Sequence, residues 1–242
     1  MLKQKLLVVS AVLVALILGF QANAVAFDTI KRNEVKFKVR IENISNAEGL
    51  TAKNGTKYPF ALSPGLFVLS DSDAPFFKVG KRANDGLEAQ AEDGNPKVLA
   101  NKLLTKVGSF FMGIFSTPIG ADKPAPIFSG GAFEFEFTSN GNKKLDFIAM
   151  YGQSNDLFFA PERAIELFDK NGNAISGDIT DKFLLWDAGT EVNQAPGIGS
   201  DQGPRQKAAN TGETENGVVN LVKDGFTYPN TKEVLRITIS QE

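Results

Sequence analysis

The sequence predicts an all-β protein, an antiparallel two-sheet β-sandwich with short inserted helices. Short segments of alternating apolar and polar residues recur along the chain, as in residues 35–44, 132–137 and 234–239. This alternation has the period of a strand with one face in a core and the other in water. Clusters of Gly, Pro, Asn and Asp separate the segments, which is typical of antiparallel strands joined by turns.

The first expected strand, residues 35–44, has the most regular alternation in the chain. Residues 60–69 are rich in apolar residues and predict one or two further strands. We expect an interruption at Pro64-Gly65, because proline cannot donate a hydrogen bond to a strand ladder.

Two short helices are predicted as an insertion among the strands. Residues 84–91 form the first, with Asn84 or Asp85 as its N-cap and Asp93-Gly94 as its end. The second, residues 97–107, places its valine and leucine side chains on one apolar face.

The phenylalanine-rich residues 110–115 are expected in the core, because large exposed apolar patches are uncommon on soluble proteins. Residues 132–137 alternate between aromatic and acidic side chains, and residues 145–151 form the next strand. We expect these two strands to pair as an antiparallel hairpin around residues 140–142.

Residues 164–168 predict a strand that ends in a hairpin turn at Asn171-Gly172. A calcium-binding EF-hand loop fits this turn poorly, because its sixth position, which needs glycine, holds Ala174. Residues 195–215 are rich in Gly, Pro, Gln and Asn and predict a long, mobile loop. Residues 234–239 form the last strand.

The amino-terminal segment predicts export. An apolar run over residues 6–20 follows a basic start and precedes the small-residue cleavage signature Ala22-Asn23-Ala24. The run is shorter than the roughly 20 residues that cross a bilayer, which favours a cleaved signal peptide (residues 1–24) over a membrane anchor. A linker (residues 25–34) and one β-sandwich domain (residues 35–242) would follow, in a secreted or periplasmic protein.

The composition excludes several kinds of chemistry. The chain has no histidine and no cysteine, so it lacks the usual zinc and copper ligands and cannot use serine–histidine or cysteine–histidine catalysis. Any bound metal must be held by oxygen. A net charge of -2 also argues against a general nucleic-acid binder.

Asp187 and Glu191 flank Gly189 just after an apolar run. In an extended strand, positions four apart would lie roughly 13 Å from each other, but glycine permits a turn that brings the carboxylates together. No lysine or arginine occurs in residues 183–204 to balance them, so a hard cation such as calcium would fill that role. The alternative is an acidic surface turn with Trp186 in the core.

Several segments resemble, in the same order, those of bacterial spondin-domain proteins. The resemblance covers residues 86–94 ("GLE-x-x-AEDG"), Ser154-Asn155-Asp156 ("PSND"), residues 164–169, Trp186-Asp187-Ala188-Gly189-Thr190-Glu191 ("WDAGTE") and Asn216-Gly217-Val218-Val219 ("ENGVV"). The chain therefore resembles a spondin N-terminal domain over residues 35–242.

This resemblance implies a two-sheet sandwich akin to calcium-dependent membrane-docking domains. It also implies a divalent cation, Ca²⁺, held by Asp156, Asp187 and Glu191, where Glu191 stands in place of the aspartate usual in the animal proteins. Calcium takes six to eight oxygens, so a carbonyl near Asn155 or Ala188 and water would complete the shell.

The resemblance implies a secreted, non-catalytic module for adhesion or matrix and surface binding, with an extracellular protein or glycan as its partner. Two alternatives stay open. Paired carboxylates can hydrolyse glycosides without histidine, although one tryptophan and three tyrosines are few for a sugar platform. Calcium-dependent membrane docking is the second alternative and rests on the fold analogy.

Overall fold

The structure is a computed structural model and describes residues 34–71, 76–105, 111–141 and 143–242. These described residues form one compact unit. The expected signal peptide, residues 1–24, lies outside the described residues. Within the described ranges, no helix is long and apolar enough to cross a membrane.

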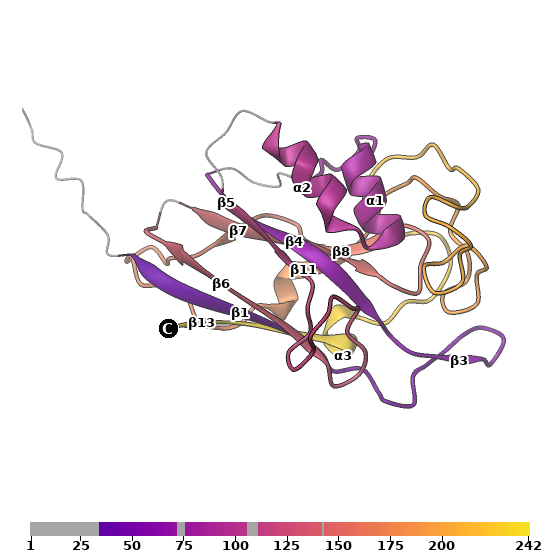
Figure 1. Cartoon of the computed structure of the whole chain (residues 1–242), viewed down its shortest axis with the longest axis horizontal. Coiled ribbons are helices and arrows are strands. Elements are labelled where there is room, and N and C mark those ends of the chain that lie inside the picture. The colour runs from indigo at the N-terminus through magenta and orange to yellow at the C-terminus, as the bar shows by residue number, and fades with distance from the viewer. Residues whose placement is uncertain (1–33, 72–75, 106–110, 142) are drawn as a thin grey trace, which may run out of the picture. The chain divides into compact units, whose positions relative to one another are not determined.

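The described fold is built on two large antiparallel sheets, as predicted for an all-β sandwich (Figure 1). The first has the order β10-β13-β1-β6 and comprises β1 (Val35–Asn43), β6 (Ala132–Ser139), β10 (Gly177–Asp178) and β13 (Leu235–Gln241). The second has the order β12-β11-β8-β7-β4-β5, with β9 paired to β7. It comprises β4 (Leu62–Ser70), β5 (Phe111–Phe115), β7 (Lys144–Tyr151), β8 (Leu157–Pro161), β9 (Ile165–Glu166), β11 (Phe183–Asp187) and β12 (Asn220–Leu221).

Three helices, a 3₁₀ turn and a small two-stranded ribbon complete the described fold. These are α1 (Asp85–Asp93), α2 (Pro96–Leu104), α3 (Thr231–Val234), the 3₁₀ turn (Thr180–Lys182) and the pair β2 (Leu50–Thr51) and β3 (Lys57–Tyr58).

The main core lies between the two sheets and is largely aromatic. The apolar residues of β1 and β6 face inward and are buried, while their charged neighbours face solvent, as the alternation predicts. Phe135 of β6 stacks on Phe67 of β4 with ring centroids 4.3 Å apart, which joins one sheet to the other. Offset-stacked rings add to the stability gained from burial.

Helices α1 and α2 cover the outer face of the second sheet (Figure 1). Leu87 of α1 and Leu99 of α2 pack with Leu66 and Ile148 in a second core. The central strands β4 and β7 are therefore buried on both faces, and each contains a run of consecutive buried residues.

Both expected helices are confirmed, and their ends follow the capping rules. The Asn84 side chain accepts hydrogen bonds from the first backbone N–H groups of α1, and Gly94 ends the helix with a left-handed φ of 61°. Asn95 caps α2, which begins at Pro96. The interruption expected at Pro64-Gly65 is a register shift in β4.

The predicted hairpin between residues 132–137 and 145–151 is wrong. β6 pairs with β1 and β7 pairs with β4, so the chain passes from one sheet to the other between them. The reason lies in their burial, because β6 exposes an acidic face to solvent whereas β7 is buried on both faces under the helices.

The expectation that residues 110–115 are core is wrong for most of the described part. β5 is the edge strand of its sheet, where Phe111 is 57% exposed and Ile114 is 40% exposed. Phe115 is buried in the aromatic core, whereas the exposed Phe111 contacts it through Phe67. The turn at Asn171-Gly172 is confirmed, closed by a bridge between Phe168 and Ala174.

Candidate metal centre

The candidate centre forms where β8 begins and β11 ends. These strands pair antiparallel with Leu157 opposite Asp187, so Asp156, which precedes β8, lies at the same sheet end as Asp187. A hydrogen bond of 3.2 Å from the Ala188 N–H to the Asp156 carbonyl continues the ladder. Strand pairing therefore brings together two acids that are 31 positions apart in the sequence.

Glu215 joins these two acids from the segment that precedes β12. Asp156, Asp187 and Glu215 each offer a carboxylate oxygen, and the three oxygens lie within 4.8 Å of one another. Oxygens bound to one calcium at about 2.3–2.6 Å can be separated by that distance. Asp156 is buried, Asp187 is partly buried and Glu215 is exposed, so the cluster opens to solvent on the Glu215 side.

Gly189 supplies the turn that the sequence predicts. Its φ is 68°, and a Cβ there would lie 2.6 Å from the Val218 backbone nitrogen. Glycine thus allows the following segment to lie directly on the turn, where the Gly217 N–H donates to the Gly189 carbonyl at 2.7 Å and the Glu215 N–H donates to the Thr190 carbonyl at 3.0 Å. These two hydrogen bonds hold Glu215 next to Asp156 and Asp187.

The Asp156 carboxylate has one occupied oxygen and one without a partner. Its Oδ2 accepts hydrogen bonds from the Thr190 N–H at 2.7 Å, the Thr190 hydroxyl at 3.1 Å and the Glu191 N–H at 3.1 Å. Its Oδ1 is buried and has no hydrogen-bond partner. A buried polar atom without a partner is costly, so the site provides an oxygen that a cation would satisfy.

Burial and mutual repulsion raise the pKa of Asp156 and of Asp187. Burial raises the pKa of Asp156 to about 7, and the charge of Asp187 adds to the effect. Burial also raises the pKa of Asp187 to about 6, with further contributions from Glu215 and Asp224. The charged groups that act on both residues are acidic, so a cation would stabilise the ionised centre.

Glu191 takes a different place from the one that the resemblance implies. Its carboxylate is buried, its Oε2 accepts from the Asn155 side chain at 3.2 Å, and it lies against Gly212, whose added Cβ would be 2.5 Å from Glu191 Cδ. The Glu191 backbone, rather than its side chain, contacts Asp156. The structure brings Asp156 and Asp187 together as expected, and it groups Glu215 with them rather than Glu191.

Two acids near the centre, Glu215 and Glu92, are not among the site residues predicted from the sequence. Glu215 stands where the "ENGVV" pattern has its glutamate, directly before residues 216–219, and this position was the one signal for it. Glu92 lies on α1 with a side chain only 2% exposed, and burial raises its pKa to about 8. The sequence does not predict that Glu92 is buried. The helix α1 is predicted from its capping residues, which do not indicate which of its faces lies against the protein.

The segment 195–215 is irregular, as expected of a loop, but it contains a buried, hydrogen-bonded side chain. Gln202 is fully buried and its side chain bonds the Gly197 N–H and the Gln194 carbonyl, each at 3.0 Å. Arg205 donates to the Gln153 side chain at 3.0 Å and to the Gly199 carbonyl at 2.7 Å. The loop is thereby tied to the segment that carries Asp156.

The chain matches no protein-family model, and no curated protein shows significant similarity to it. The geometry of the centre is therefore the basis for a proposed function.

Proposed function

We propose that this chain is a secreted or periplasmic, calcium-binding β-sandwich module of the spondin type that binds an extracellular protein or glycan without catalysing a reaction. The observation that carries the proposal is the fully buried Asp156, whose partnerless Oδ1 belongs to a carboxylate clustered with Asp187 and Glu215. In the part of the chain that the structure describes, no other group of three acids is as closely spaced.

Calcium, a hard cation, fits these residues better than zinc or copper does. The donors are all carboxylates, which hard cations prefer, and the chain has no histidine or cysteine for softer metals. Asp156, Asp187 and Glu215 would hold the ion, and it would neutralise their repulsion. The ion would thus connect the segments that carry these residues, which matches a structural or ligand-binding role.

Thermal unfolding with and without calcium tests the proposal. An ion that binds only the folded state stabilises it by mass action. Extracellular sites often bind calcium at about 10⁻⁴ to 10⁻³ M, so 10 mM calcium should add roughly 1.4–2.7 kcal/mol. For a domain of this size, this corresponds to a rise in melting temperature of about 3–10 °C over the value in chelator.

Asp187→Asn should remove most of the calcium response, because it removes a charged ligand while keeping the size of the side chain. Asp122→Asn is the matched control, since Asp122 is an exposed aspartate outside the cluster, and it should respond like the wild type. Equal melting temperatures in chelator and in 10 mM calcium for the wild type would support the acidic surface turn instead.

A separate screen addresses the non-catalytic part of the proposal. The purified protein, incubated with a panel of polysaccharides in calcium, should release no reducing sugar. Release that Asp187→Asn abolishes would show a glycoside hydrolase that uses its paired carboxylates.

A further inference from the structure

An open pocket of about 640 Å³ lies beside the candidate metal centre. Asp187 and Glu215 line it, so two of the three clustered acids form part of its wall. Its volume falls within the range of small-molecule binding pockets, roughly 300–1,000 Å³. The pocket therefore has room for a ligand larger than an ion.

One side of the pocket is aliphatic and exposed. Val79, Val218 and Leu221 line it and are 58%, 37% and 51% exposed. Trp186 also lines the pocket but is only 2% exposed, because its indole N–H donates inward to the Ala160 carbonyl at 3.0 Å. The apolar contact that a ligand can make here is with aliphatic side chains rather than with an aromatic face.

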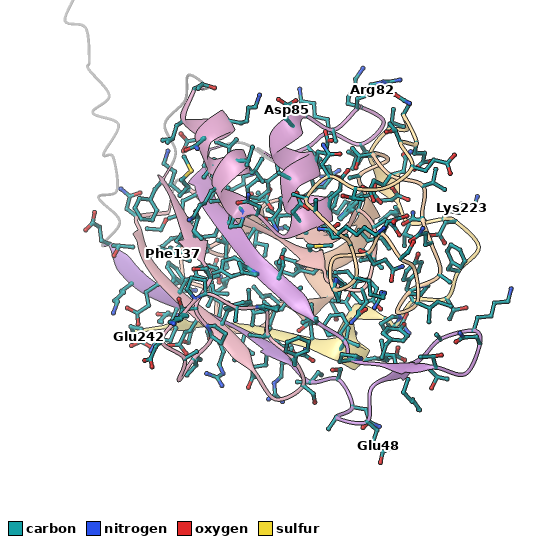
Figure 2. The ribbon with its side chains drawn as sticks, turned by 45° about the vertical axis from the view of Figure 1, so that its right-hand side comes forward. Glu48, Arg82, Asp85, Phe137, Lys223 and Glu242 are labelled. Atoms are coloured by element: carbon teal, nitrogen blue, oxygen red, sulfur yellow. The ribbon has the colours of Figure 1, made fainter. Side chains whose placement is uncertain are left out.

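The polar side of the pocket carries both hydrogen-bond acceptors and donors. Asp187, Glu215 and Glu162 supply carboxylates, and Lys223 and Asn220 supply N–H donors. Lys223 lies on the loops opposite the Phe137 side of the protein (Figure 2). Lys223 takes part in none of the ion pairs among the described residues, so its amine is available to a ligand.

This mixture of charges disfavours ligands that carry one kind of charge. A phosphate or carboxylate would approach Lys223, but it would also meet Glu162 and a metal centre whose three carboxylates outweigh the two charges of calcium. A basic side chain would be repelled by Lys223. A hydroxyl group can donate to a carboxylate and accept from an amine or amide. Neighbouring hydroxyls on a ring with an apolar C–H face match both sides of the pocket.

We propose that this pocket binds a neutral polyhydroxylated ligand, a sugar ring with vicinal hydroxyls. The hydroxyls bond the carboxylate oxygens of Asp187 and Glu215 that the ion does not use, together with the donors Lys223 and Asn220. The C–H face of the ring packs on Val79, Val218 and Leu221. The proposal deepens the proposed function, and rests on it, because Asp187 and Glu215 also belong to the candidate metal centre.

Saturation-transfer NMR in 10 mM calcium tests the proposal with methyl glycosides of mannose, glucose and galactose as probes. At least one glycoside should receive magnetisation from the protein, and its per-O-methylated counterpart, which has the same ring without hydroxyl donors, should bind at least tenfold more weakly. Failure of all three glycosides, or equal binding of a glycoside and its methylated counterpart, would overturn the proposal.

Variants locate the binding on the protein. Leu221→Ser removes part of the aliphatic wall without touching the acids and should weaken glycoside binding about fivefold while leaving the calcium-induced rise in melting temperature unchanged. Ile119→Ser is the matched control, because Ile119 is 50% exposed and does not line the pocket, and it should bind as the wild type does. Equal weakening by both substitutions would contradict the assignment.

The two proposals fail in distinguishable ways. A calcium-induced rise in melting temperature without glycoside binding would overturn the sugar pocket and keep the metal centre. Glycoside binding that Leu221→Ser weakens, in a protein that calcium does not stabilise, would keep the sugar pocket and overturn the metal centre. Co-sedimentation with phosphatidylserine vesicles in calcium, with no glycoside bound, would replace the sugar with an anionic lipid surface.

Discussion

Asp156→Asn should stabilise the ion-free protein, although it changes a fully buried, hydrogen-bonded residue. The amide oxygen of asparagine can accept the three hydrogen bonds that Asp156 Oδ2 receives from Thr190 and Glu191. The amide nitrogen then takes the place of the partnerless Oδ1, where it can donate to the neighbouring carboxylates. The substitution replaces repulsion with hydrogen bonding.

The raised pKa sets the size of the effect and its dependence on pH. Burial raises the pKa of Asp156 from 3.8 to about 7, so between about pH 4 and pH 7 the folded protein binds more protons than the unfolded chain. Stability then falls as the pH rises through this window. At about 1.4 kcal/mol per pKa unit, the upper bound on the loss above pH 7 is about 4 kcal/mol.

Relaxation around the charge reduces this bound, and we expect Asp156→Asn to gain about 2 kcal/mol in chelator at pH 8. The gain should disappear near pH 4, where the folded wild-type protein holds Asp156 protonated. Urea unfolding at both pH values, followed by the fluorescence of the one tryptophan, Trp186, which is buried, measures the difference. In 10 mM calcium, which should add roughly 1.4–2.7 kcal/mol to the wild type, most or all of this advantage of Asp156→Asn should disappear.

Asp169→Asn provides a control of opposite sign. Hydrogen bonds from the Asn173 side chain and from the turn backbone lower the pKa of Asp169, so its ionised form is favoured in the folded protein, and the substitution should destabilise the protein at pH 8. If Asp156→Asn also destabilises the ion-free protein at pH 8, the reasoning from repulsion and the partnerless oxygen is refuted.

Three further predictions concern the ligands, the turn and the amino terminus. Glu215→Gln should remove most of the calcium-induced rise in melting temperature and Glu191→Gln much less; equal losses would contradict the grouping with Glu215. Gly189→Ala should cost about 2–3 kcal/mol in urea unfolding, because its Cβ would meet the next segment of backbone. Gly55→Ala, at a left-handed glycine with open space around it, should cost only about 1 kcal/mol. Mass spectrometry of exported protein should find Val25 as the first residue, and a chain that retains the apolar run would refute cleavage.

The sequence predicts the fold class well, because the apolar positions of each alternating strand indicate which of its faces is buried. The patterns of β1 and β6 match their burial along their lengths. Sheet membership is harder to predict, since strands adjacent in the sequence, such as β6 and β7, belong to different sheets. Local pattern cannot distinguish a hairpin from a crossing between sheets when both connections are short.

Part of the candidate site can be predicted from the sequence, and part depends on contacts between distant segments. Asp187 and the turn at Gly189 can be read from adjacent residues, because the positive φ of Gly189 needs glycine. The choice between Glu191 and Glu215 depends on which side chain the folded loop turns toward Asp156. Backbone hydrogen bonds between distant segments decide that choice. The spacing of acidic residues along the sequence does not predict these hydrogen bonds.

A crystal structure grown in calcium, with anomalous diffraction data, tests the central claim most directly. The account predicts one anomalous peak within about 2.3–2.6 Å of oxygens from Asp156, Asp187 and Glu215. The absence of a peak there, or a peak coordinated by Glu191 without Glu215, would contradict it.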